Sequence, residues 1–147
     1  MTAAPVLPRK QWMAILAKAA PQRLMQLMPD LPPHALLRAP EIGAVMVQGR
    51  AGVTGDAFNL GEMTVTRASV RLDCGTVGHA WVQGRDKAHA LRAALADALL
   101  QTDAADSVRS QIVVPLAAEA RAAAEQRAET AATTKVDFFT MVRGEDA

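Results

Sequence analysis

The order of hydrophobic and polar residues predicts helices at both ends of the chain and strands between them. Apolar side chains recur at helical spacing between Arg9 and Ala20. A second short helix begins at Pro21, which suits a first helical turn, and it ends before Pro29. The pattern then becomes strand-like in four segments, residues 36–40, 44–48, 58–72 and 77–83.

The long segment from Phe58 to Leu72 defines the two faces of the predicted sheet. Its even-numbered residues from Thr64 onward lie on one face, whereas Arg67, Ser69 and Arg71 lie on the other, where they contact solvent or a partner. A turn then leads into the return strand that carries Trp81. Because consecutive hairpins pair antiparallel, we expect an antiparallel sheet.

The helical pattern returns after Gly84. Asp86 is placed to cap a helix that continues to about residue 101. Residues 112–114 have the composition of a short edge strand, and Pro115 opens an Ala-rich helix to about Thr133. The sequence therefore predicts an α+β fold in a single domain (1–147). Its antiparallel β-sheet has about four strands flanked by α-helices, with a loose N-terminus (1–8) and an extended C-terminal arm (134–147).

Composition and charge exclude several classes of protein. The 16 basic and 15 acidic residues nearly cancel, so the chain has no electrostatic footprint for nucleic acid or for a membrane surface. The single cysteine, Cys74, excludes an internal disulfide and any metal site built from this chain's thiols alone. The sequence has no apolar run of transmembrane length and no signal-peptide pattern, so we expect a cytoplasmic protein.

The segment Val136–Gly144 is unusually apolar and holds two of the three Phe residues. Aromatic side chains at the end of a chain need burial, either on its own core or on a partner. One interpretation is a final strand of the sheet, and the other is a docking arm, since Phe and Arg favour interface cores. The candidate interface residues are Phe138, Phe139, Met141, Val142 and Arg143.

Phosphate binding has one main candidate, the start of the helix after Gly84. Helix N-termini attract anions, and Arg85 and Lys87 add positive charge there, although solvated basic residues on a capped helix would look the same. Arg50 lies in the glycine-containing segment 49–56, which is either an anion-binding nest or, as we favour, a flexible hairpin connection. Arg50 and Arg85 each end a Val-Gln-Gly-Arg sequence, and both copies lie at the end of a predicted strand. If the two strands were neighbours, both Arg residues would point to one edge of the sheet.

The sequence contains no recognisable catalytic constellation. His34, His79 and His89 have no Ser, Cys or carboxylate partner at a diagnostic spacing, so ordinary structural or surface roles are favoured. We therefore predict no catalytic residue and no metal ligand in this chain.

Three stretches together resemble the PhnG family, a subunit of the carbon–phosphorus lyase system for phosphonate breakdown. They are residues 11–17, 66–90 and 136–144. The resemblance implies a multi-subunit core assembly with PhnH-, PhnI- and PhnJ-type partners. With the PhnI, PhnH and PhnL proteins, the family makes α-D-ribose 1-methylphosphonate 5-triphosphate from MgATP and methylphosphonate, and adenine is released. The iron–sulfur and S-adenosylmethionine chemistry belongs to the PhnJ-type partner, and we expect no cofactor on this chain.

Three hypotheses about this chain follow. It is a structural subunit of that transferase, docked through the C-terminal arm. Alternatively, Arg85, Lys87 and Arg50 contribute directly to the binding of ATP or phosphonate. The third hypothesis sets the resemblance aside and describes a small α+β adaptor of an unrelated complex. The sequence leaves open whether the chain also forms a homodimer.

Overall fold

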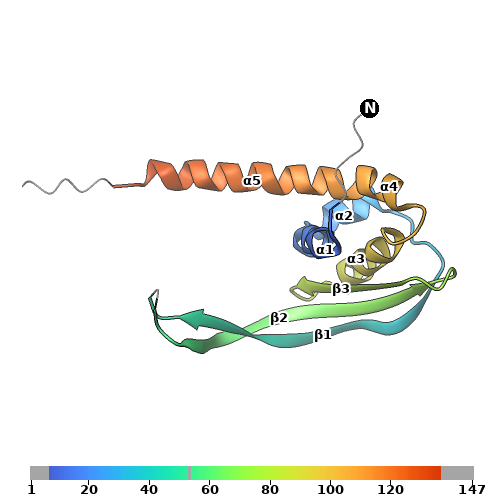
Figure 1. The fold of residues 1–147 in the computed structure, drawn as a ribbon, viewed down its shortest axis with the longest axis horizontal. Helices are drawn as coiled ribbons and strands as arrows, with labels where there is room; N and C mark the ends of the chain where they lie inside the picture. The colour runs from blue at the N-terminus through green and yellow to red at the C-terminus, as the bar shows by residue number, and fades with distance from the viewer. Residues whose placement is uncertain (1–6, 53, 137–147) are drawn as a thin grey trace, which may run out of the picture.

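A computed structural model describes residues 7–52 and 54–136 of the chain. The elements are α1 (Arg9–Lys18), α2 (Pro21–Leu27), β1 (His34–Arg50), β2 (Ala57–Leu72), β3 (Val77–Gln83), α3 (Lys87–Leu99), α4 (Ala105–Val108), the π-helical turn η1 (Arg109–Val113) and α5 (Val114–Thr133). The sheet is antiparallel in the order β1-β2-β3. Helices α1, α2 and α3 lie on one side of it, and α5 runs above them (Figure 1). The predicted α+β class is confirmed.

The number of strands is a correction to the prediction of about four. In the described part of the chain the sheet has three strands, because segments 36–40 and 44–48 form the single strand β1. Pro40, which cannot donate to a ladder, lies at a shift in register between Arg38 and Glu41. Because β1 is an edge strand, proline is tolerated at such an irregularity without ending the strand.

The second correction concerns residues 112–114, which are helical and not an edge strand. Ile112 and Val113 are buried, and they belong to the turn η1 that leads into α5. Their β-branched side chains pack into the helical layer, and this packing outweighs their preference for strands. Pro115 lies in the first turn of α5, as expected.

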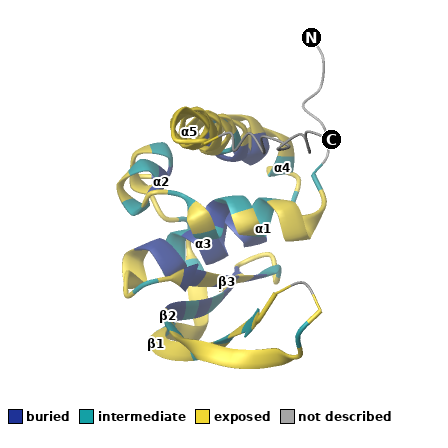
Figure 2. Ribbon diagram, turned by 90° about the vertical axis from the view of Figure 1, so that its left-hand side faces the viewer, coloured by how far each residue is buried: buried dark blue, intermediate teal, exposed yellow. Residues whose placement is uncertain are grey.

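The core lies between the helices and the inner face of the sheet. The predicted inner face of β2 is buried at Thr66, Ala68, Val70 and Leu72, whereas Thr64, also predicted on this face, is exposed. Figure 2 shows that burial concentrates in α3 and the strands beneath it. A Cβ atom added at Gly78 of β3 would lie 2.0 Å from the carbonyl oxygen of Ala94. Helix α3 thus packs directly on the sheet, and its many Ala residues permit that approach.

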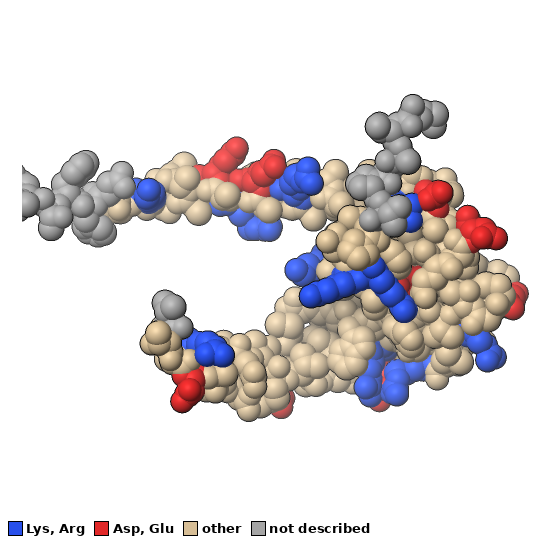
Figure 3. Space-filling model, viewed as in Figure 1, with Lys and Arg blue, Asp and Glu red and all other residues tan. Residues whose placement is uncertain are grey.

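Two elements extend beyond this core on the same side of the molecule. Strand β3 ends at Gln83, which pairs with Val65, so the β1–β2 ribbon continues alone as a distal hairpin, residues 45–63. Above it, α5 projects past the helical layer (Figure 1). The space-filling view shows an open hollow between these two arms (Figure 3).

Candidate interaction surfaces

Asp97 of α3 links three elements of the core. Its side chain is fully buried, and its carboxylate accepts hydrogen bonds from the Arg9 guanidinium (2.7 and 3.1 Å), Trp12 Nε1 (2.8 Å) and the backbone N–H of His79 (2.9 Å). The hydrogen bonds that Arg9 donates to Asp97 raise the pKa of Arg9. These contacts hold α1 against α3 and against the free edge of β3, and they fix the strand that presents Trp81.

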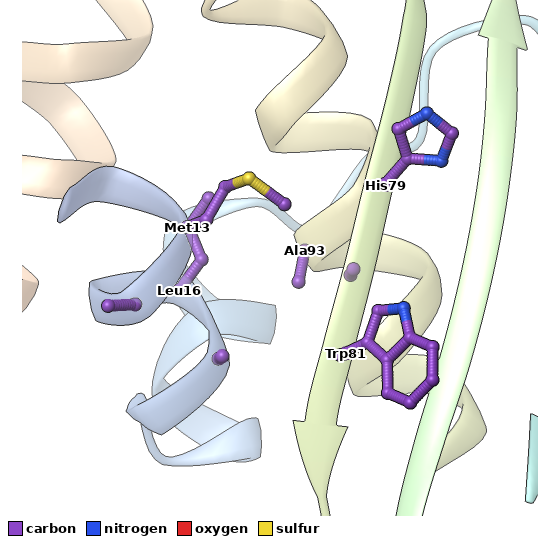
Figure 4. Close-up of a pocket in the computed structure, with 8 residues that line it drawn as sticks. Met13, Leu16, His79, Trp81 and Ala93 are labelled. Carbon is purple, nitrogen blue, oxygen red and sulfur yellow. The ribbon is translucent and has the colours of Figure 1, made fainter. Parts of the chain in front are cut away.

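An apolar hollow of about 210 Å³ lies between α1 and the free edge of β3. Figure 4 places Met13 and Leu16 on one side of the strand and the rings of His79 and Trp81 on the other. The Trp81 side chain is about half exposed, at 52%. The hollow has little polar lining, so its composition suits contact with an apolar side chain better than acid–base chemistry.

The outer face of the sheet, turned away from the helices, carries an ordered polar layer. The strand register places Glu41, Arg67 and Trp81 in one cross-strand row and Arg38, Ser69 and His79 in the next. Glu41 accepts hydrogen bonds from Arg38 (2.9 Å) and Arg67 (3.1 and 3.2 Å). The hydrogen bond from Arg38, followed by that from Arg67, lowers the pKa of Glu41.

Two further contacts complete this layer. The Arg67 guanidinium lies 5.6 Å from the centroid of the Trp81 ring, within the range of a cation–π contact. Ser69 Oγ and His79 Nδ1 are hydrogen-bonded at 2.8 Å. No carboxylate contacts the His79 ring within the described residues, so the pair lacks the orienting third group of a nucleophilic triad.

The structure separates Arg50 from the other two predicted phosphate ligands, Arg85 and Lys87. Arg50 lies at the tip of the distal hairpin, where its guanidinium donates to the carbonyl of Gly55 (3.2 Å). Arg85 and Lys87 flank Asp86, the confirmed N-cap of α3, whose carboxylate accepts from the N–H of His89 (2.8 Å).

The strand register also gives the distance between Arg50 and Arg85. Gly84, the residue before Arg85, donates a backbone hydrogen bond to Thr64, and Thr64 pairs with Ala44. Arg50 is six residues further along β1, about 20 Å at the rise of a strand. The repeated Val-Gln-Gly-Arg sequence therefore does not bring Arg50 and Arg85 together, because β2 separates their strands.

The remaining histidines and the cysteine have structural surroundings. His89 is buried and its Nε2 donates to the carbonyl of Leu16 (2.8 Å), while His34 Nδ1 bonds to the carbonyl of Pro32 (2.7 Å). Cys74 is exposed in the β2–β3 turn, and a hydrogen bond with Thr76 lowers its pKa. Across residues 7–52 and 54–136, no group of three His, Cys, Asp or Glu side chains is placed to hold a metal ion. No helix of the described chain has both the length and the apolarity needed to cross a membrane.

Helix α5 has very little packing of its own. Leu116 is its one buried residue among those described, and every residue from 118 to 133 is exposed. Near its base, Glu119 forms an ion pair with Arg23 (2.8 Å). A hollow of about 360 Å³ lies between α5 and α1. The predicted interface residues beyond it, Phe138, Phe139, Met141, Val142 and Arg143, lie outside the described residues.

Comparison with known proteins decides the family. Residues 7–144 match the family described as "Phosphonate metabolism protein PhnG". The chain belongs to the PhnG family. It is 47% identical over 148 aligned residues to the "Alpha-D-ribose 1-methylphosphonate 5-triphosphate synthase subunit PhnG" of Rhizobium meliloti (strain 1021), covering 96% of this chain and 92% of that protein. The resemblance identified from the sequence motifs is confirmed, and it argues against the adaptor of an unrelated complex.

Proposed function

We propose that this PhnG-family chain is a non-catalytic assembly subunit of α-D-ribose 1-methylphosphonate 5-triphosphate synthase. The synthase transfers the ribose 5-triphosphate group of MgATP to methylphosphonate and releases adenine. The partners are PhnI-, PhnH- and PhnJ-type subunits in the cytoplasm, with a PhnL-type protein for this step. Iron–sulfur and S-adenosylmethionine chemistry resides on the PhnJ-type partner.

The exposed helix α5 is the observation that carries this proposal. In proteins, most helical stability comes from packing one face of the helix, and α5 buries only Leu116 among its twenty residues. A helix of this kind gains stability when a partner covers it. The aromatic sequence 136–144 continues directly from the end of α5, so helix and tail would form one docking arm.

The distal hairpin supports the same role. An isolated two-stranded ribbon is marginally stable in water, and this one exposes large apolar side chains. Met46, Phe58 and Leu60 are 55%, 46% and 68% exposed. A partner inserted between the hairpin and α5 would cover both arms.

Truncation tests the docking arm. The full chain and a chain ending at Lys135 are each co-expressed with the PhnH-, PhnI- and PhnJ-type subunits, and the complexes are compared by size and by turnover of ATP and methylphosphonate. We expect the truncated chain to fold but to separate from the complex, with loss of turnover. A full-size, active complex with the truncated chain would overturn the docking arm.

A second candidate function is direct binding of the triphosphate or the phosphonate. The observation in its favour is that Arg85 and Lys87 flank the N-terminus of the 13-residue helix α3, where charge-assisted hydrogen bonds to a phosphate would form. In this case Arg85→Ala and Lys87→Ala would lower nucleotide affinity and turnover in an intact complex. Arg50→Ala tests the distant hairpin tip separately. Unchanged affinity and turnover in all three variants would exclude this function.

A further inference from the structure

We propose that the outer face of the sheet, centred on Trp81 and the depression beside Gly43, docks a partner protein through an apolar side chain surrounded by carboxylates. This contact is separate from the docking arm formed by α5 and the tail. It rests on the proposed assembly role and adds a second interface with defined chemistry.

The register establishes that one set of side chains shares this face. Glu41 pairs with Arg67 and Arg67 with Trp81, while Gly43 pairs with Val65. Directly paired residues on antiparallel strands project to the same side of a sheet. The alternate residues of β2 are buried under the helices, so this set faces away from the core.

The face contains a depression of about 140 Å³ beside the Trp81 ring. Gly43 contributes no side chain there, and a Cβ atom added to it would meet nothing within 4 Å. Val65 lines the depression and is 9% exposed. The lining is mixed, with Val65 and Trp81 on the apolar side and Glu41 and Arg67 on the charged side. An aromatic wall beside a small depression is typical of the site where one anchoring side chain of a partner binds.

The charge of the face selects an acidic partner. Arg38, Arg67 and Arg71 lie on it together with Glu41, in a chain whose net charge is only +1. Arg38 and Arg67 both bond to Glu41, whereas Arg71 is exposed and forms no ion pair with another described residue. Complementary charge favours association with carboxylates around the anchor.

The same geometry favours a protein over a free phosphate. The carboxylate of Glu41 lines the depression, and it would repel an anion held there. Arg38 and Arg67 converge on the carboxylate of Glu41, which already neutralises part of their charge, and Arg71 is not part of that cluster. A protein surface can place one side chain in the depression and contact Arg71 with another.

The contacts among these side chains also prepare the face for binding. Glu41 holds the guanidinium of Arg67, which in turn lies over Trp81. Side chains that are already ordered lose less conformational entropy when a partner binds. Exposed Trp and Arg in such an arrangement are the residue types that dominate binding energy at interfaces.

A substitution that fills the depression tests the proposal without destabilising the fold. Gly43→Val places a β-branched side chain in open space on a strand, so the isolated chain should keep its melting temperature. Gly61→Val is the control for the melting temperature alone, because Gly61 is also a strand glycine with nothing within 4 Å of an added Cβ but lies in the distal hairpin. Arg71→Glu reverses a charge on the face, and Lys10→Glu reverses one on exposed α1.

Each variant of the full chain is co-expressed with the PhnH-, PhnI- and PhnJ-type subunits, and dissociation of the complex is followed by light scattering as NaCl is raised. We expect Gly43→Val and Arg71→Glu to weaken assembly at least tenfold, and Lys10→Glu to assemble like the unaltered chain.

The other outcomes separate this proposal from the docking arm. Normal assembly of Gly43→Val and Arg71→Glu, with loss of assembly on truncation at Lys135, would overturn this interface and leave the assembly role standing. An intact complex of Arg71→Glu that has lost turnover would mean that the face binds a small anion, and it would also overturn the proposal. Weakened assembly of the face variants with normal assembly of the truncated chain would support this interface and overturn the docking arm.

Discussion

At the scale of single residues, Asp97 has the largest expected effect on stability. Asp97→Ala leaves Trp12 Nε1 and the His79 N–H without their acceptor, and unpaired buried donors cost about 1–3 kcal/mol each. We expect a loss of about 2–4 kcal/mol in the free energy of unfolding, measured with urea. Arg9→Gln should cost less than Asp97→Ala: it leaves the buried Asp97 carboxylate without its counter-charge, but that carboxylate keeps Trp12 Nε1 and the His79 N–H as donors. Equal losses in the two variants would contradict this assignment.

Glu41 allows a prediction about pH at the same scale. Its pKa is lowered in the folded chain, first by Arg38 and then by Arg67. Its pairing therefore adds to stability above about pH 4.3, the ordinary pKa of a glutamate, and is lost as the pH falls through the lower folded value. Titration of the Glu41 carboxyl carbon by NMR should show a higher pKa in Arg38→Ala and in Arg67→Ala than in the unaltered chain. An unchanged pKa in both variants would mean that these contacts do not persist in solution.

The sequence indicated some of these residues and not others. The alternation of Arg67, Ser69 and Arg71 predicted an outward face, because period-two patterning is a local property of a strand. Glu41 and Trp81 join that face only through the cross-strand register, which the sequence alone did not specify. Asp97 gave no signal, since an acidic residue in a helical pattern normally suggests a solvated position.

At the scale of elements, the contact between α3 and β3 depends on Gly78. A methyl group added there would meet the backbone of Ala94 and Ala98, which can yield only if the helix moves. Gly78→Ala should therefore destabilise the chain by about 1–3 kcal/mol in urea unfolding. Gly61→Ala is the control on the same sheet and should be close to neutral, because its side chain enters open space. A stabilised Gly78→Ala variant would show that α3 does not pack as closely as described.

Local patterns predicted most elements correctly, and tertiary context decided the others. Helical periodicity, the Asp86 cap and Pro115 located α1, α3 and α5. The prediction of an edge strand at residues 112–114 was wrong because buried β-branched residues also fit a helical layer. Pro40 suggested a break between two strands, and only its position on an edge strand explains why β1 continues.

At the scale of the whole molecule, the shape implies two arms that a partner must cover. Amide hydrogen exchange should be fast in the distal hairpin, residues 45–63, and in α5 from residue 118 to 133, because neither packs on the core. It should be slow in residues 65–72 and 89–98, where the strands and α3 are buried. In the complex with the PhnH-, PhnI- and PhnJ-type subunits, we expect exchange in both arms to slow at least tenfold. Slow exchange of both arms in the isolated chain at high dilution would contradict the assembly role, since it would mean that the arms are stable without a partner.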